Sequence, residues 1–297
     1  MINTLSLEDY MVAMGVISSR PLTIKHHGYN RFHIVGDRSG TQNGWVKVIE
    51  PSKLFIFGSW KTGERFIWRA NGPAVPSYIR AQLSQKAKEA EAHRLAETKA
   101  KALVEAKEIW GAAEPPFQHA YLARKQISGV GARQFGSRLI VPVFNARSQL
   151  LSLQHIDESG NKRFHRSLSP KGGFLLLGPS PMPGAPILLC EGYATGVTLF
   201  ENLGMSVAIA FSADNLLEVG RIIRSLFSRS KLWVCADNDH ATAGNPGLTK
   251  ARAAAYQLHG RLIVPPTISG ISDFNDLFCL SGKAALLACV EAASPAH

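Results

Sequence analysis

Apolar runs that end abruptly in polar or charged residues recur through the last third of the chain. The runs occupy residues 187–190, 207–211, 231–236 and 261–264. Helical patterns follow them at residues 195–203, 215–227 and 247–259, and a last one starts at Lys283. Because buried parallel strands are apolar on both faces and alternate with helices, this pattern predicts a compact, doubly wound α/β domain with four parallel strands over residues 186–297.

The first 75 residues follow a different pattern, with short runs in which apolar and polar residues alternate. These runs lie at residues 31–35, 44–49, 54–57 and 65–69, with turn residues between them. They predict a small antiparallel β-rich module. Most of its Phe and Trp side chains are expected to face inward. Any that are exposed could stack on nucleic-acid bases, with the phosphates held by Lys53, Lys61, Arg65 and Arg69.

Two further segments lie between these parts. Residues 76–113 are rich in Ala, Lys, Glu, Gln and Arg, which predicts one long connecting helix that ends before Glu114-Pro-Pro116. Residues 114–185 contain strand-like runs at 138–144, 151–156 and 162–166, with a tight turn at Ser159-Gly160. The second segment is therefore expected to be an α+β subdomain built on a meander.

The charge of the chain is unevenly distributed. The formal net charge is +11, but residues 1–185 carry 25 Lys and Arg against 13 Asp and Glu, while residues 186–297 carry 8 against 9. An excess of positive charge favours an anionic partner, and nucleic acid is the leading candidate. Basic composition alone is also found in proteins that bind no nucleic acid.

The four cysteines are widely spaced and form no Cys-x-x-Cys pair, so no structural zinc is expected. The N-terminus lacks the apolar segment of a signal peptide, and no apolar run approaches the roughly 20 residues that a membrane span needs. We therefore expect a cytoplasmic protein in a reducing environment, with no membrane partner.

Acidic residues follow two of the predicted parallel strands directly. Glu191 comes after the run at 187–190, and Asp237 and Asp239 come at the end of the run at 231–236. In open α/β sheets the ligand site lies beyond the carboxyl ends of the strands. Three carboxylates at one edge would repel one another unless a cation such as Mg²⁺ lay between them. The sequence therefore predicts a metal site that also contacts phosphates.

Four motifs in this region resemble the Toprim domain, in the variant found in plasmid and phage primases. They are Glu191-Gly-Tyr-Ala-Thr195, Ala236-Asp-Asn-Asp239, Asn245-Pro-Gly247 with Lys250, and Asp273-Phe-Asn-Asp-Leu277. The resemblance implies a Rossmann-like parallel sheet in which Asp237 and Asp239 bind Mg²⁺ or Mn²⁺. It implies that Glu191 is either a further ligand or a general acid/base. Other residues of these motifs would lie beside the site, namely Gly192, Asn245, Lys250, Asp273 and Asp276. Asp273 and Asp276 could supplement the metal site or fix neighbouring loops. Lys250, in the first turn of a helix, could meet a triphosphate, and the alternative interpretation is a surface lysine.

The basic segment before this domain resembles the subdomain that precedes Toprim in bacterial-type primases. Between Tyr121 and Lys171 it carries nine Lys and Arg but only two acidic residues. The resemblance implies that four of its residues face template or nucleotide phosphates, namely Arg138, Lys162, Arg163 and Lys171. The alternative interpretation is a solvated, charged face.

Taken together, the resemblances imply a DNA primase that makes short RNA primers on single-stranded DNA from nucleoside triphosphates, in the replication of a plasmid, phage or integrated element. A replicative helicase would be a further partner. Two alternatives remain open from the sequence. One is a Toprim nuclease that uses the same carboxylates to hydrolyse a phosphodiester bond. The other is a non-catalytic nucleic-acid-binding module for replication or recombination.

Overall fold

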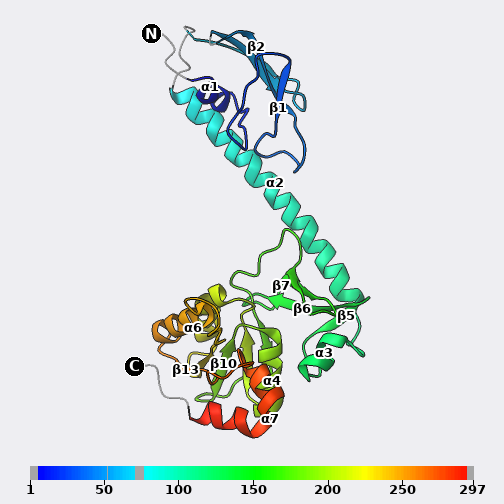
Figure 1. The fold of residues 1–297 in the computed structure, drawn as a ribbon, viewed down its shortest axis with the longest axis vertical. Coiled ribbons are helices and arrows are strands. Elements are labelled where there is room, and N and C mark those ends of the chain that lie inside the picture. Colours follow the sequence, from blue (N-terminus) through cyan, green and yellow to red (C-terminus); the bar gives the residue numbers. More distant parts are fainter. Residues whose placement is uncertain (1–5, 52, 71–76, 293–297) are drawn as a thin grey trace. The chain divides into compact units, whose positions relative to one another are not determined.

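The computed structural model describes residues 6–51, 53–70 and 77–292. The chain forms two compact units, which divide between Thr98 and Lys99. Figure 1 shows the helices and strands of both. Among the described residues, no helix is both long enough and apolar enough to cross a membrane.

The first unit contains a helix and a four-stranded antiparallel sheet. Its elements are α1 (Leu7–Ala13), β1 (Tyr29–Phe32), β2 (Gly44–Glu50), β3 (Leu54–Ser59) and β4 (Arg65–Arg69), and the strands lie in chain order. The expected strands are present. Helix α1 is not predicted by the pattern. Ser6 begins it by accepting a hydrogen bond from the Asp9 backbone N–H, and its buried Met11 joins the core of the sheet.

Helix α2 (Ser77–Ala112) agrees closely with the expected connecting helix. In the second unit its last turns pack against an antiparallel sheet through small side chains. Ala102 and Ala106 contact a cluster that includes Ile140 and Leu153. Alanine lets the helix approach this sheet closely, which explains why a segment with few large apolar residues is buried on one side.

That second sheet is the predicted meander with one additional strand. Its elements are α3 (Ala120–Lys125), β5 (Arg133–Phe135), β6 (Arg138–Phe144), β7 (Leu150–Ile156) and β8 (Lys162–Phe164), and the strands lie in chain order. Successive side chains point to opposite faces of a strand. Ile140 and Leu153 therefore face α2, whereas Val141 and Ile156 face the core that this sheet shares with the C-terminal domain.

The C-terminal domain is built on a five-stranded sheet in the order β13-β12-β10-β11-β9. The strands are β9 (Leu175–Leu177), β10 (Pro186–Cys190), β11 (Ser206–Ile209), β12 (Lys231–Cys235) and β13 (Arg261–Ile263). The four predicted strands are parallel to one another. The fifth, β9, pairs antiparallel with β11 at the edge and was not predicted.

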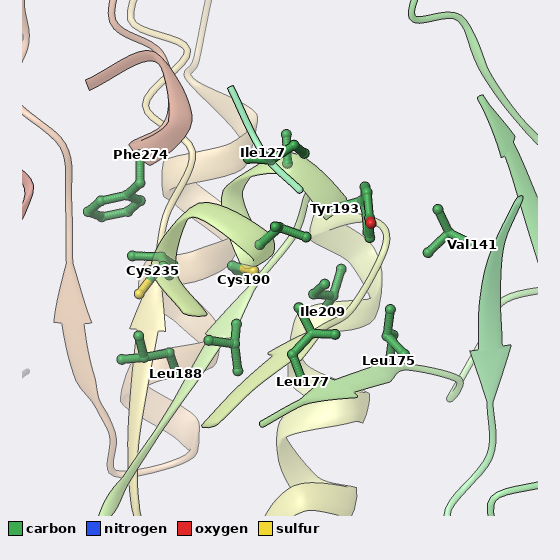
Figure 2. Close-up of a cluster of buried hydrophobic side chains, with 14 of the residues drawn as sticks. Ile127, Val141, Leu175, Leu177, Leu188, Cys190, Tyr193, Ile209, Cys235 and Phe274 are labelled. Carbon is green, nitrogen blue, oxygen red and sulfur yellow. The ribbon is translucent and has the colours of Figure 1, made fainter. Parts of the chain in front are cut away.

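Helices cover both faces of this sheet (Figure 1). They are α4 (Tyr193–Leu203), α5 (Leu216–Leu226), α6 (Pro246–Gln257) and α7 (Phe274–Glu291), with a short 3₁₀ helix at Ala213–Asn215. Leu188 and Cys190 of β10 pack on the side of α4 and α7, and Leu189 packs on the side of α5 and α6. Figure 2 shows the first of these clusters, in which Val141 of the β5–β8 sheet lies across from Tyr193 of α4.

The last helix corrects one prediction. It begins at Phe274, whereas the pattern predicted a start at Lys283. The Asp273 side chain accepts a hydrogen bond of 2.7 Å from the Asp276 backbone N–H, which caps an additional first segment. Gly282 then interrupts the helix at φ 77°, a left-handed conformation that favours glycine, and Lys283 begins the second segment.

Candidate active site

The acidic residues lie at the carboxyl ends of two neighbouring parallel strands. Cys190 of β10 pairs with Cys235 of β12, so Glu191 and Asp237 leave the sheet at the same edge. This placement follows from the local sequence, because each apolar strand is followed almost directly by its carboxylate. The predicted acidic site is therefore assembled by the sheet itself.

Asp237 is a buried carboxyl group at this edge, and its surroundings disfavour the charged form. Burial raises its pKa well above the ordinary value, and the charges of Glu191, Asp273 and Asp239 raise it further. Its Oδ1 atom is buried and has no hydrogen-bond partner within the part of the chain that the structure describes. A buried carboxylate oxygen without a donor is costly, which indicates a site made to receive a cation or a proton.

Glu191 belongs to the same electrostatic group. Burial raises its pKa, a hydrogen bond from the backbone of Ala213 opposes that effect, and the charge of Asp239 raises the pKa again. The main chain of Glu191 is held as well, since its carbonyl accepts a hydrogen bond of 2.8 Å from the Phe211 N–H. The position of Glu191 is thus set by the segment that follows β11.

Asn238, between the two aspartates, anchors their loop. It is almost completely buried, and its amide donates to the Pro265 carbonyl at 3.0 Å and to the Thr267 hydroxyl at 3.2 Å. Its side-chain oxygen accepts from the Asn245 amide at 2.7 Å. The loop at Asn238 is therefore held by three side-chain hydrogen bonds. Asn245 also caps α6, which ties the loop to the start of that helix.

Gly247, in the first turn of α6, packs directly against this loop. A Cβ atom at Gly247 would lie 3.0 Å from the Asp237 carbonyl oxygen and 3.5 Å from Oδ2 of Asp239. The absence of a side chain therefore lets α6 approach both aspartates. The Asn-Pro-Gly motif contained this signal, because a glycine just inside a helix start often marks close packing.

Two other residues of the Toprim-like motifs have local roles. Gly192 caps α4 at φ −91°, an extended conformation open to any residue, so its backbone does not require glycine. Lys250 forms an ion pair with the exposed Asp214. Its charge still lowers the pKa of Glu191, which places Lys250 near the acidic edge.

Asp273 and Asp276 differ in their surroundings. Burial raises the pKa of Asp273, and the negative charge of Asp273 raises the pKa of Asp237. Asp276 lies 3.2 Å from the Lys125 ammonium and accepts a hydrogen bond of 2.8 Å from the Ser272 hydroxyl. Although burial by itself raises the pKa of Asp276, these partners lower it overall. Asp273 therefore belongs to the acidic group, while Asp276 fixes the adjacent loop and α3.

The four predicted basic residues do not lie on one surface. Lys162 of β8 lies opposite Ile156 in the strand register, on the face of the sheet that packs against the C-terminal domain, where the carboxylates are. Its charge lowers the pKa of Glu191, Asp237 and Asp273. Arg163 is adjacent on the same strand, so its side chain points to the opposite face. In the strand register it lies opposite His155. Arg138 is on that opposite face too, since its charge lowers the pKa of His155 after the larger effects of burial and of His165.

The turn that carries Lys171 is held by Asn215, a residue that the sequence did not single out. In this Lys171-Gly-Gly turn, the Gly172 N–H donates a hydrogen bond of 2.8 Å to the Asn215 side chain. The Asn215 amide, which is buried, donates to the carbonyls of Pro170, Gly173 and Ala210. Asn215 thus holds the Lys171 turn beside the segment that positions Glu191. Its place at the start of a helix was the only local signal.

The residues at this edge suit a hard divalent cation. Glu191, Asp237 and Asp239 offer only oxygen donors, the type of ligand that Mg²⁺ prefers. Among the residues described, no group of three or more His, Cys, Asp or Glu side chains is arranged so that it could hold a metal ion as it stands. The carboxylates are nevertheless close enough to raise one another's pKa, and a cation between them would offset that repulsion.

Comparison with known families places this fold. Residues 186–284 match the family model of the Toprim domain. The match includes Glu191, Asp237, Asp239 and the Asp273 motif, and it confirms the expected Rossmann-like domain. The C-terminal part of the chain is therefore a Toprim domain.

The chain is also similar to curated and solved primases. It is 29% and 30% identical, each over 250 residues, to two proteins from Escherichia coli named DNA primase TraC. Each match covers 80% of this chain but only 24% and 17% of those relatives. The primase fragment of the bacteriophage T7 primase-helicase aligns with 60% of this chain and 80% of its own at 14% identity and a TM-score of 0.43. The Aquifex aeolicus primase aligns with 98% of this chain and 86% of its own at 14% identity and a TM-score of 0.38.

Proposed function

We propose that this chain is a DNA primase that synthesises short RNA primers on single-stranded DNA by metal-dependent nucleotidyl transfer. The observation that carries the proposal is the position of Lys162, which faces the carboxylates of the Toprim domain from a second sheet. A cation opposite a metal-binding acidic group is the arrangement that a nucleotide's phosphates require. The similarity to DNA primase TraC over 80% of the chain supports the same activity.

The acidic edge would hold the metal ion. Glu191, Asp237 and Asp239 are the proposed ligands for Mg²⁺ or Mn²⁺, with Glu191 as a ligand or as a general acid/base. The bound ion supplies charge stabilisation to the attacking and leaving oxygens of an in-line transfer. Asn238 and Asn245 keep the two aspartates in place through their mutual hydrogen bond, and Asp273 adds negative charge beside Asp237.

The basic residues would divide between nucleotide and template. Lys162 is proposed to bind the phosphates of the incoming nucleotide. Lys171 lies on the turn that Asn215 holds beside the segment that positions Glu191. Arg138 and Arg163 lie on the opposite face of the β5–β8 sheet and would hold template away from the carboxylates. Single-stranded DNA, nucleoside triphosphates and a replicative helicase are the proposed partners, in the cytoplasm.

A primer-synthesis assay tests the proposal. The purified chain is incubated with single-stranded DNA of mixed sequence, labelled ribonucleotides and Mg²⁺ or Mn²⁺. Short labelled products that need both template and metal are the expected result. Metal-dependent shortening of an end-labelled DNA without nucleotides would instead indicate a nuclease. Retention of DNA in a gel shift with neither reaction would indicate a binding module.

Neighbouring residues on β8 provide a matched pair of variants. We expect Lys162→Gln to lower primer synthesis about tenfold, or about 1.4 kcal/mol, because the cation that faces the carboxylates is lost. Arg163→Gln should have a much smaller effect on the synthesis rate at saturating template, because its side chain is on the other face. Steady-state rates across a range of nucleotide concentrations measure both. Equal losses in the two variants would contradict the proposed role of Lys162.

A further inference from the structure

The sheet of the first unit has one buried face and one open face. Phe32, Val46, Phe57 and Trp68 lie on the buried face and pack with Met11 of α1. The pairing register places the neighbouring residues on the other face, where Tyr29, Ile49 and Ile67 are exposed. The open face therefore carries the side chains of β1–β4 that point away from the core.

Three aromatic rings gather on the open face. Tyr29 of β1, Trp45 of β2 and Trp60, just after β3, lie with ring centroids 5.3 to 5.8 Å apart. Trp45 is buried beneath the other two and against Gly58, where a Cβ atom would come within 3.0 Å of its ring. Tyr29 and Trp60 are 55% and 47% exposed. Large aromatic rings left this exposed, on a supported base, are typical of a binding surface.

Cations accompany the rings. The Arg31 guanidinium lies 4.8 Å from the centroid of Trp60, and the Lys47 ammonium lies 5.5 Å from that of Tyr29. Arg65 and Arg69 of β4 are on the same face and exposed. In the regular part of the described sheet, no Asp or Glu occupies this face, and Glu50 at the end of β2 pairs with Lys53 at 2.8 Å.

Two lysines expected to bind phosphates are engaged elsewhere. Lys53 forms the pair with Glu50, and Lys61 donates to the buried Asp37 carboxylate at 2.7 Å. Burial by itself raises the pKa of Asp37, but hydrogen bonds from Lys61 and Asn43 outweigh it and lower the pKa. Arg65 and Arg69 are exposed on the open face. Arg31 and Lys47, rather than Lys53 and Lys61, are the cations that lie beside the rings.

A hollow adjoins the open face at Arg31. Its volume is about 750 Å³, and its lining includes Arg20, Asn30, Arg31 and Gln42. This volume is within the range of small-molecule sites, and the lining is rich in hydrogen-bonding groups and positive charge. A nucleotide next to the rings would find room and polar partners there.

We propose that the open face of β1–β4, with Tyr29, Trp45, Trp60, Arg31 and Lys47, binds single-stranded DNA outside the Toprim site. Unpaired bases expose ring faces that stack on aromatic side chains, and the cations around the rings neutralise the phosphates. A duplex keeps its base faces stacked internally and cannot use the rings. The choice of DNA over RNA rests on the proposed function. The presence of the stacking surface does not rest on the proposed function.

Binding of a fluorescent oligothymidylate to the full chain tests this site, in EDTA and without nucleotides. Trp60→Ala should weaken binding about tenfold, and Trp60→Phe should restore most of the affinity because a ring is present again. Lys47→Gln should reduce the slope of log K against log salt by about 0.7, the value for one phosphate contact on a single strand. Thermal unfolding of each variant checks that the first unit is folded.

Matched controls come from the second unit. Tyr256→Ala removes an exposed aromatic ring and Arg229→Gln an exposed cation, and both should leave the affinity unchanged. Wild-type affinity in Trp60→Ala would overturn the proposal. So would duplex DNA or the matching oligouridylate competing as well as the single-stranded DNA.

This test is separate from the test of catalysis. A chain that binds DNA through Trp60 but makes no primers would overturn the proposed function and leave this site in place. A chain that makes primers but binds DNA equally well without Trp60 would overturn this site alone.

Discussion

Asp237→Asn is expected to abolish primer synthesis while leaving the fold intact. We expect a fall of about a thousandfold or more, which corresponds to about 4 kcal/mol of lost transition-state stabilisation. The amide keeps the shape of the side chain but removes the charge at the most buried carboxylate of the acidic edge. The measurement is the rate of primer formation at saturating template, nucleotide and Mg²⁺.

The control for this variant is Glu291→Gln. Glu291 is exposed, and its carbonyl accepts a hydrogen bond from Arg261, the first residue of β13, so it lies at the opposite edge of the sheet. The Glu291→Gln variant should retain the wild-type rate of primer synthesis. Primer synthesis by Asp237→Asn within tenfold of wild type would show that the metal lies elsewhere.

Divalent metal and pH should act on the stability of the second unit through the same carboxylates. Burial and mutual repulsion raise the pKa of Asp237 and Glu191 in the folded state. Raised pKa values mean that the folded protein holds these protons more tightly than the unfolded chain does. Without metal, this stability is fully present below the ordinary carboxyl pKa and is lost as pH rises through the raised values.

Thermal unfolding in EDTA, from about pH 4 to about pH 8, measures this loss. Asp237→Asn should melt higher than wild type at the upper end by at least about 2 °C, a shift typical of about 1 kcal/mol in a domain of this size. The two proteins should converge at the lower end. Addition of Mg²⁺ at constant ionic strength should raise the melting temperature of wild type more than that of the variant.

An unchanged wild-type melting temperature across this pH range, with and without Mg²⁺, would contradict the electrostatic account of the site. A rise produced equally by Na⁺ would contradict a divalent site, because ionic screening alone would then explain it.

Much of the C-terminal domain could be predicted because its signals are local. The apolar runs of β10 and β12 are buried on both faces, so their positions and their parallel pairing follow from composition alone. The runs end in Glu191 and Asp237 without a long loop, and this proximity in sequence places both at one edge. By contrast, β9 has only three residues, and the start of α7 was hidden within the Asp273 motif.

The sequence by itself determined which residues stand at the acidic edge, since strand ends are local features. Only the tertiary structure decided which side chains face that edge, because alternation along a strand defines two faces but not which of them another element covers. Lys162 and Arg163 are neighbours of the same charge type, yet only Lys162 lowers the pKa of the carboxylates. In the first unit, Trp68 is buried in the core while Trp60 is exposed on the open face, for the same physical reason.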